Sequence, residues 1–398
     1  MNKLRVLMMA AFSASLAACS GMPASDQAQA EVPVVSIAPL ADIYDTVWIR
    51  GGDGSVKTLE QVADDLSRYD VVFFGEFHGH SGIHLAQMQI FRALQQRYAG
   101  MTLSLEQFER DTQPLLDQYL AGEIGEKVLQ QDGRGWPNYE QSYRPLVEFA
   151  KDNGLPVVAA NAPKQAVICI SKKGPEFLNE IPMPDRNWVA AELHIDEGAY
   201  LDKYTSFIMS SSTHGSDKKD ADDAARKGRC ADDETETGME GGTSKNTHAM
   251  AMAPDGGTDG EMSEMMQAMI MKSFSSQVLR DDTMAESIAL HLQDYPDRKV
   301  LHLDGNFHSA SHLGTVERLK LRMPELKIAV INPIAVEDNN SPAWTDEDAA
   351  TGDYILLVRE MPEMFVCEAS ELEFQRKTIK KRMGNKCVYS QETAQHEE

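Results

Sequence analysis

Short, nearly continuous apolar runs alternate along the chain with stretches in which apolar residues recur every three or four positions. The apolar runs span residues 71–74, 101–105, 155–160, 300–303, 328–331 and 354–358. The amphipathic stretches span residues 83–98, 143–153, 282–295 and 315–321. Continuous apolar strands separated by helices are typical of a parallel sheet that is covered on both faces. The pattern therefore predicts an α/β fold with a mostly parallel sheet flanked by helices.

Residues from about 210 to 260 break this pattern, because Ser, Thr, Asp, Lys, Gly and Met dominate there and branched aliphatic residues are almost absent. Such a stretch cannot bury enough apolar surface to order itself alone. We therefore predict a Met-rich, largely helical or disordered insertion at 206–272. It divides the α/β domain into a first part at 39–205 and a second part at 273–360, and residues 361–398 form a C-terminal extension.

Methionines are concentrated at the end of this insertion. They are Met262, Met265, Met266, Met269 and Met271, and His248, Met250 and Met252 lie just before them. Thioethers together with imidazole can bind copper, whereas methionine on a helix more often provides flexible packing. Copper binding through the insertion is therefore an alternative function that the sequence leaves open.

The N-terminal residues have the layout of a secretory signal. Lys3 and Arg5 precede an apolar run at 6–16 that is too short to span a membrane, so we predict a signal peptide at 1–18. Small residues then lead to Cys19.

The junction Leu16-Ala17-Ala18-Cys19 resembles the bacterial lipoprotein box, in which the cysteine becomes the lipidated first residue of the mature chain. We expect acylation of Cys19, with palmitate among the acyl chains, followed by a tether at 19–38. Because Ser20 follows the cysteine where inner-membrane retention favours Asp, the resemblance implies an outer-membrane anchor and a periplasmic body.

Charge excludes one class of partner. The 398 residues include 38 Lys and Arg against 62 Asp and Glu, which gives a formal net charge of -24. Such a field repels a phosphate backbone, so we expect no nucleic-acid partner. The content of 42% hydrophobic and 25% charged residues is that of a soluble folded protein.

Four cysteines remain beyond Cys19: Cys169, Cys230, Cys367 and Cys387. An even number in an oxidising compartment favours disulfides over free thiols. Cys367 with Cys387 would close a C-terminal loop, and Cys169 with Cys230 would tie the base of the insertion. Four cysteines allow three pairings, and the sequence does not choose among them.

The residues suited to chemistry lie at predicted strand ends. Gly75-Glu76-Phe77-His78 follows the first apolar run, and Gly305-Asn306-Phe307-His308 follows the fourth. The same G-x-x-H motif therefore occurs at the ends of two strands that are far apart in sequence. Glu106 ends the second strand and Asn161 ends the third. The carboxyl ends of parallel strands share one edge of the sheet, so these side chains should converge there.

Such a site has two uses. His78, His308 and Glu106 can hold a divalent metal ion that activates water, or a histidine can act as a general base that Glu76 or Glu106 orients. His80 and His84 are one helical turn apart and offer a second ligand pair.

Six sequence blocks carry a resemblance to a known family. In chain order they are Gly75-Glu76-Phe77-His78, Leu105-Glu106-Gln107-Phe108, Tyr143-Arg144-Pro145, Ala159-Ala160-Asn161-Ala162-Pro163, Arg280-Asp281-Asp282-Thr283-Met284-Ala285 and Gly305-Asn306-Phe307-His308. Together they resemble the ChaN-type haem-binding lipoproteins, which belong with the erythromycin esterase and Tiki/TraB groups. In those groups the paired motifs form a hydrolytic or metal site, so the shared scaffold does not fix the activity.

The resemblance implies a periplasm-facing lipoprotein that binds haem or iron for uptake, as a homodimer enclosing cofacial haems with tyrosinate ligation and with an outer-membrane receptor as partner. It offers as cofactor-binding residues Tyr139, Tyr143, Arg144, Asn161, Asp281 and Met284. The two tyrosines serve equally well to pack their helix against the sheet. A metal- or His-dependent hydrolase, using His78, Glu76, Glu106 and His308, is the alternative.

Overall fold

The computed structural model describes residues 37–213 and 259–389. The predicted signal peptide, Cys19, nearly all of the predicted tether, Cys230 and the group of His248, Met250 and Met252 lie outside these residues.

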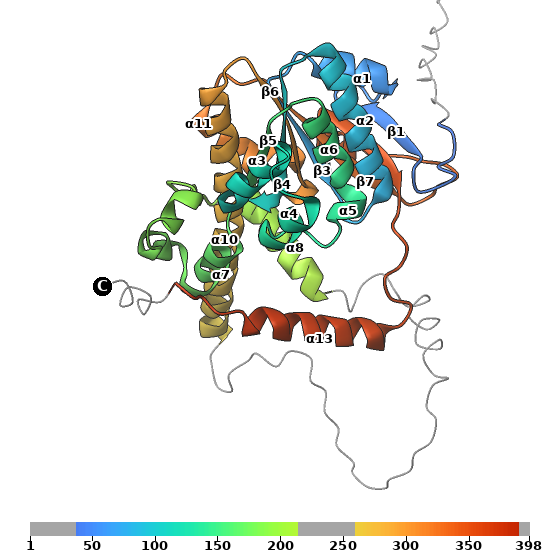
Figure 1. The fold of residues 1–398 in the computed structure, drawn as a ribbon. Coiled ribbons are helices and arrows are strands. Elements are labelled where there is room, and N and C mark those ends of the chain that lie inside the picture. Colours follow the sequence, from blue (N-terminus) through green and yellow to red (C-terminus); the bar gives the residue numbers. More distant parts are fainter. Residues whose placement is uncertain (1–36, 214–258, 390–398) are drawn as a thin grey trace, which may run out of the picture. The chain divides into compact units, whose positions relative to one another are not determined.

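One eight-stranded sheet forms the centre of the fold, in the order β2-β1-β8-β7-β3-β6-β4-β5 (Figure 1). Its strands are β1 (Thr46–Arg50), β2 (Val56–Lys57), β3 (Val71–Glu76), β4 (Met101–Glu109), β5 (Val157–Asn161), β6 (Lys299–Gly305), β7 (Ile328–Val336) and β8 (Tyr354–Arg359). Neighbours from β8 to β5 pair in parallel, which confirms the predicted mostly parallel α/β sheet. The antiparallel edge of β1 and β2 was not predicted, because both strands are short and polar at their ends.

Helices cover both faces of the sheet (Figure 1). They are α1 (Leu59–Leu66), α2 (Ser81–Arg97), α3 (Gln113–Leu120), α4 (Glu126–Asp132), α5 (Tyr139–Ser142), α6 (Arg144–Asp152), α7 (Lys164–Lys173), α8 (Ala199–Thr213), α10 (Asp259–Asp294), α11 (Thr315–Arg322), α12 (Asp346–Ala349) and α13 (Glu368–Gly384). Side chains of β3 alternate between two cores: Val72 and Phe74 pack with α1, α2 and α6, while Val71 and Phe73 pack with α10 and α11. Within the described residues, no helix is long and apolar enough to cross a membrane.

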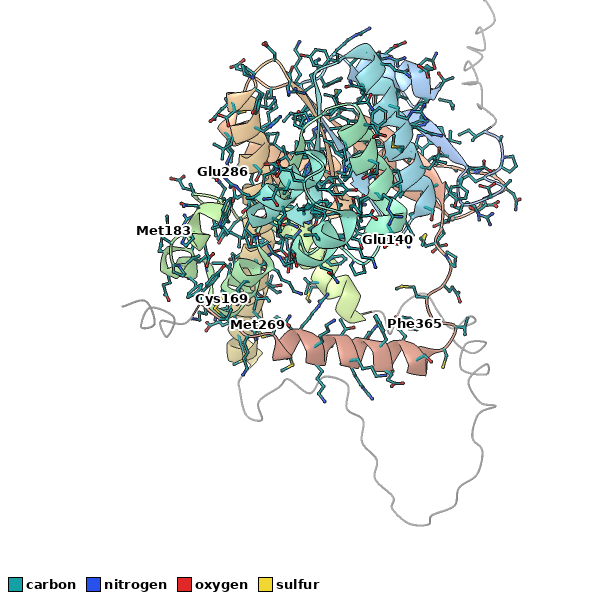
Figure 2. All side chains as sticks on the ribbon, viewed as in Figure 1. Glu140, Cys169, Met183, Met269, Glu286 and Phe365 are labelled. Carbon is teal, nitrogen blue, oxygen red and sulfur yellow. A yellow bond between two sulfur atoms is a disulfide. The ribbon has the colours of Figure 1, made fainter. Side chains whose placement is uncertain are left out.

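Helix α10 joins the Met-rich run to the core. Near its start, Met265, Met266 and Met269 are exposed, whereas Ala285 and Ile288 further along are fully buried against the sheet. Figure 2 labels Met269 in the first part of this helix and Glu286 in the second. Packing therefore holds the second part of the helix, and the part that carries the methionines extends beyond the sheet.

A disulfide joins Cys169 of α7 to Cys387, which follows α13. Lys172 and Gln165, also on α7, donate hydrogen bonds to carbonyl groups of the same C-terminal segment. The pairing of Cys169 with Cys230, and of Cys367 with Cys387, is therefore wrong. The 17 residues of α13 separate Cys367 from Cys387 by about 25 Å, too far for a disulfide. Cys367 is itself disulfide-bonded.

Candidate functional site at the carboxyl edge of the sheet

The two G-x-x-H motifs lie side by side because β3 and β6 are neighbours in the sheet. In their register Gly75 is opposite Asp304 and Glu76 is opposite Gly305, so the second motif begins one residue later than the first. The side chains after the two strands therefore differ in depth. The imidazole of His78 is 48% exposed, whereas that of His308 is 8% exposed.

Glu76 is a buried carboxylate that accepts hydrogen bonds from several side chains around His78. Its carboxylate accepts hydrogen bonds from Nδ1 of His78 (2.9 Å), Nε2 of Gln87 (2.9 Å), Nε2 of Gln107 (3.2 Å) and the hydroxyl of Tyr143. Burial favours the neutral acid, but the hydrogen bond from His78 and the nearby imidazoles outweigh it and lower the pKa of Glu76. The carboxylate is therefore ionised.

His78 is held in one orientation. Because Nδ1 donates to ionised Glu76, Nε2 lies on the other side of the ring, near Gly305, and no hydrogen bond to it occurs within the described residues. The edge of the ring packs against Trp136, with centroids 4.8 Å apart. Burial opposes the charged form, but the hydrogen bond to Glu76 and the charge of Glu106 raise the pKa of His78. The result is a basic imidazole with an available nitrogen.

Gly305 makes room for this imidazole. A Cβ atom at Gly305 would lie 2.9 Å from Cε1 and 3.0 Å from Nε2 of His78. The backbone of β6 can approach the ring only because this residue has no side chain.

Glu106 lies between the two histidines. Its Oε2 accepts a hydrogen bond from the backbone N–H of Gly305 (2.7 Å), and its Oε1 is 3.5 Å from Nε2 of His308. The pairing of β4 with β5 shifts register between Leu105 and Glu109. Such an irregularity re-aims side chains at the end of a strand, which here brings Glu106 over β6.

His308 is fixed by Asp281, a fully buried residue of α10. Nδ1 of His308 donates to Oδ1 of Asp281 (2.7 Å). The same carboxylate accepts hydrogen bonds from the hydroxyls of Tyr200 (2.6 Å) and Thr315 (2.8 Å). Burial disfavours the charged imidazole, but the charges of Asp281 and Glu106 outweigh it and raise the pKa of His308 to about 9. At neutral pH this is a buried imidazolium between two carboxylates.

A second polar pair lies beneath the site on β6. Nδ1 of His302 is 2.9 Å from the hydroxyl of Ser104, and burial lowers the pKa of His302 to about 3, so this ring is neutral. Burial raises the pKa of Asp304 well above its ordinary value. Oδ2 of Asp304 and Nε2 of His302 are 3.9 Å apart, and neither has a hydrogen-bond partner within the described residues. A neutral acid therefore faces a neutral base.

Substituting Asp304 with Asn tests this protonation state. Because the folded-state pKa of Asp304 is raised, folding is disfavoured as pH rises above the ordinary value of 3.8, and a neutral amide removes that cost. We expect D304N to leave the free energy of unfolding nearly unchanged at pH 4 and to raise it by about 1 kcal/mol or more at pH 8. Urea unfolding at the two pH values measures the difference. The control is D294N, at an exposed position of α10, and a D304N protein less stable than its parent at pH 8 would contradict a neutral Asp304.

Substituting Gly305 with Ala tests the packing around His78. The new methyl group should push the ring outward, at a cost of about 1–3 kcal/mol in stability. Modification by diethylpyrocarbonate, followed by peptide mass analysis, should then show faster reaction of His78. G125A is the matched control, because a Cβ atom there meets nothing within 4 Å. Equal reaction rates of His78 in parent and G305A would show that Gly305 does not confine the ring.

Other residues suggested by the sequence lie apart from this group. Arg144 pairs with Glu126 and, at 3.5 Å, with Glu140, which Figure 2 labels, rather than with a site carboxylate. Asn161 accepts hydrogen bonds from the Ala162 N–H (2.8 Å) and from Arg280 (3.4 Å). Met284 is fully buried in α10.

The histidines of α2 are engaged locally. His80 caps the helix, because its Nδ1 accepts from the Ile83 N–H and its Nε2 donates to the Arg359 carbonyl (2.9 Å). His84 packs beneath the site, with Nδ1 3.7 Å from Glu76 and Nε2 3.1 Å from the His78 carbonyl. They point to different partners and do not form a ligand pair.

The two candidate tyrosines are both buried. Burial and the charge of Glu76 raise the pKa of Tyr143, whose hydroxyl donates to Glu76. Burial likewise raises the pKa of Tyr139, whose hydroxyl has no partner among the described residues. Both rings are protonated phenols within the core, which matches their packing role.

Across residues 37–213 and 259–389, no three His, Cys, Asp or Glu side chains are grouped so as to hold a metal ion. His78, Glu106 and His308 are close together, but both nitrogens of His308 are protonated and face carboxylates. A protonated imidazole must lose a proton before it can bind a metal ion, so the raised pKa of His308 weakens metal binding at neutral pH.

Asp281 hydrogen-bonds to both His308 and Tyr200, and the sequence motifs did not reveal this arrangement. One signal was present in the sequence. Arg280-Asp281-Asp282 places three consecutive charged residues in a helix that is otherwise apolar on its sheet-facing side. Charges on a buried face need partners, and Asp281 finds His308.

The chain is thus an α/β protein whose parallel sheet carries paired His and carboxylate side chains at its carboxyl edge. Residues 62–319 match the family described as haem-binding uptake, Tiki superfamily, ChaN. The chain belongs to this family.

Two solved structures are similar to this chain, and the first of them shows the same fold. One describes cofacial haem binding to ChaN of Campylobacter jejuni; it has a TM-score of 0.51 and 15% identity, over 79% of this chain and 98% of that one. A mutant of the erythromycin esterase EreC in its open conformation has a TM-score of 0.39 and 12% identity, over 80% of this chain and 99% of that one.

A chloroplast protein, Protein RETICULATA-RELATED 5 of Arabidopsis thaliana, is 26% identical over 145 residues. The match covers 35% of this chain and 20% of the length of that relative.

Proposed function

We propose that this protein is a lipid-anchored, periplasm-facing protein of the outer membrane that captures haem for iron uptake. The observation that carries the proposal is the family match, because residues 62–319 include every member of the carboxyl-edge site. The predicted signal peptide and Cys19 support the location. The homodimer and the outer-membrane receptor belong to the same proposal.

The residues of the site fit a haem through His78 rather than through Tyr139 or Tyr143. A side chain that would bind haem iron needs an accessible lone pair, and both tyrosines are buried phenols. His78 is half-exposed, its Nε2 is available, and ionised Glu76 holds Nδ1. A carboxylate behind a ligating imidazole fixes its orientation and increases its basicity. Bound haem would supply an iron atom that takes this nitrogen as ligand.

A haemin titration followed by visible absorbance tests the proposal, using protein that lacks residues 1–19. We expect a saturable Soret band at defined stoichiometry. H78N should weaken binding at least about tenfold, because it removes the ligating nitrogen. The matched control is H312N at a half-exposed histidine outside the carboxyl-edge site, where φ is 59° and Asn is tolerated.

Two outcomes would contradict the proposal. Absence of a Soret band in the parent would contradict haem capture. Equal haemin affinity of H78N and its parent would show that His78 is not the ligand of the iron. Light scattering with and without haemin decides whether the protein forms a dimer.

A second candidate is acid–base hydrolysis at the same edge. The observation that favours it is the pair of histidines, each oriented by a buried carboxylate and both beside Glu106. His78 would take a proton from an attacking water molecule, while the charge of imidazolium His308 would stabilise the developing oxyanion. Turnover of p-nitrophenyl butyrate that is lost in both H78N and H308N would support it. Rates in both variants equal to that of the parent would exclude it.

A further inference from the structure

A hollow lies at the edge of the sheet opposite to the carboxyl-edge site. It has a volume of about 430 Å³ and is formed by residues that precede the parallel strands β3, β7 and β8 or end the antiparallel strand β1. The residues that matter most are Arg50, Arg68, Tyr69, Lys327 and Tyr354. The carboxyl-edge site follows β3, β4 and β6 instead, so the two sites are separated by the length of the strands.

The carboxylates of this hollow already have partners. Asp65 accepts a hydrogen bond from the hydroxyl of Tyr354 (2.7 Å) and lies 3.9 Å from Arg68. Asp353 accepts from the Val330 N–H (2.8 Å) and is 3.2 Å from Nε2 of His312. Neither carboxylate therefore depends on the other cations of the hollow.

The cations are far less engaged. Within the described parts of the chain, the side chains of Arg50 and Lys327 make neither a hydrogen bond nor an ion pair, although both line the hollow. The Arg68 side chain is 76% exposed and has only the distant contact with Asp65. Three positive groups facing one hollow are unusual in a chain of net charge -24.

Two tyrosines form the walls. The ring of Tyr354 is buried, and its hydroxyl is fixed by Asp65. Tyr69 is partly exposed, and burial raises its pKa, so its hydroxyl remains a hydrogen-bond donor. The partly exposed ring of Tyr69 beside exposed cationic groups suits a ligand with a flat apolar body and an anionic end.

We propose that this hollow binds a small organic dianion, with a phosphate monoester as its chemical class. The two cations without partners, Arg50 and Lys327, match two negative charges, and a guanidinium group can bind two phosphate oxygens at once. The hollow is large enough for a small molecule. This site does not depend on haem capture, because it uses none of the residues at the carboxyl edge.

Isothermal titration calorimetry with phenyl phosphate at pH 8 and low salt tests the proposal on the chain that lacks residues 1–19. We expect saturable binding at one site per chain, with inorganic phosphate binding more weakly because it lacks the aromatic body. The double variant R50Q/K327Q should weaken phenyl phosphate binding at least about tenfold. The matched control R92Q/K127Q removes two exposed cations from α2 and α4 and should bind like the parent.

Three results would overturn the proposal: no saturable heat with phenyl phosphate, equal affinity in R50Q/K327Q and the parent, or equal losses in both double variants. The last would show that net charge alone drives binding. A further experiment measures binding of the protein to phosphatidylglycerol vesicles. Vesicle binding that R50Q/K327Q abolishes, without phenyl phosphate binding, would assign the hollow to lipid headgroups and overturn the soluble ligand. Because H78N keeps the hollow intact, its phosphate binding should equal that of the parent even where haem capture fails.

Discussion

D281N should lower the free energy of unfolding by about 3–5 kcal/mol, the cost of removing one partner from a buried ion pair. Asp281 is fully buried and accepts hydrogen bonds from His308, Tyr200 and Thr315. An amide has no charge to balance the imidazolium and replaces one acceptor oxygen by a donor. Urea unfolding at pH 7 measures the loss.

The control for this variant is D294N, which makes the same chemical change at an exposed position of α10. It should stay within about 0.5 kcal/mol of the parent. D304N should have the opposite effect on the free energy of unfolding, because the buried Asp304 is neutral whereas the buried Asp281 is charged. If D281N were as stable as D294N, the ion pair with His308 would contribute nothing to folding.

The free energy of unfolding should fall as pH rises from 6.5 to 8, by about 2 kcal/mol. The pKa of His308 is raised from 6.5 to about 9 in the folded protein, so its stabilising contribution is complete below pH 6.5 and is lost as pH approaches 9. The raised pKa of His78 acts in the same direction. Above pH 8 Lys203, whose pKa burial lowers to about 8, acts in the opposite direction.

Chemical unfolding at half-unit intervals of pH measures this slope. In D281N the pKa of His308 should fall, because its nearest negative charge is gone, and the slope should become shallower. A parent protein whose stability is constant from pH 6.5 to 8 would show that His308 is not an imidazolium in the fold.

The hydrophobic pattern predicted the centre of the fold because the six parallel strands are buried on both faces and read as continuous apolar runs. Strand β2 was not predicted, since its two residues carry no periodic signal. The disulfide pairing was predicted wrongly for another reason. Proximity in sequence suggested Cys367 with Cys387, but the helix between them keeps the two cysteines apart.

The carboxyl-edge site was predictable as far as strand ends and motifs determine it. Glu76 and Glu106 lie in strands that the sequence reveals, His78 and His308 follow such strands, and the structure brings these residues together. The sequence does not specify which side chains stand behind them. Asp281 reaches His308 from a helix, and Tyr143 reaches Glu76 from the loop before α6, through tertiary contacts with no fixed spacing.

The strand order has a consequence for how this chain is made. Strands β3 and β4 follow each other in sequence, but β6 lies between them in the sheet and is synthesised only after the whole Met-rich segment. A partly synthesised chain therefore presents two open strand edges with strongly apolar residues, the kind of surface that promotes aggregation. Folding of this protein should thus depend on holding chaperones until residues 299–305 emerge and close the gap.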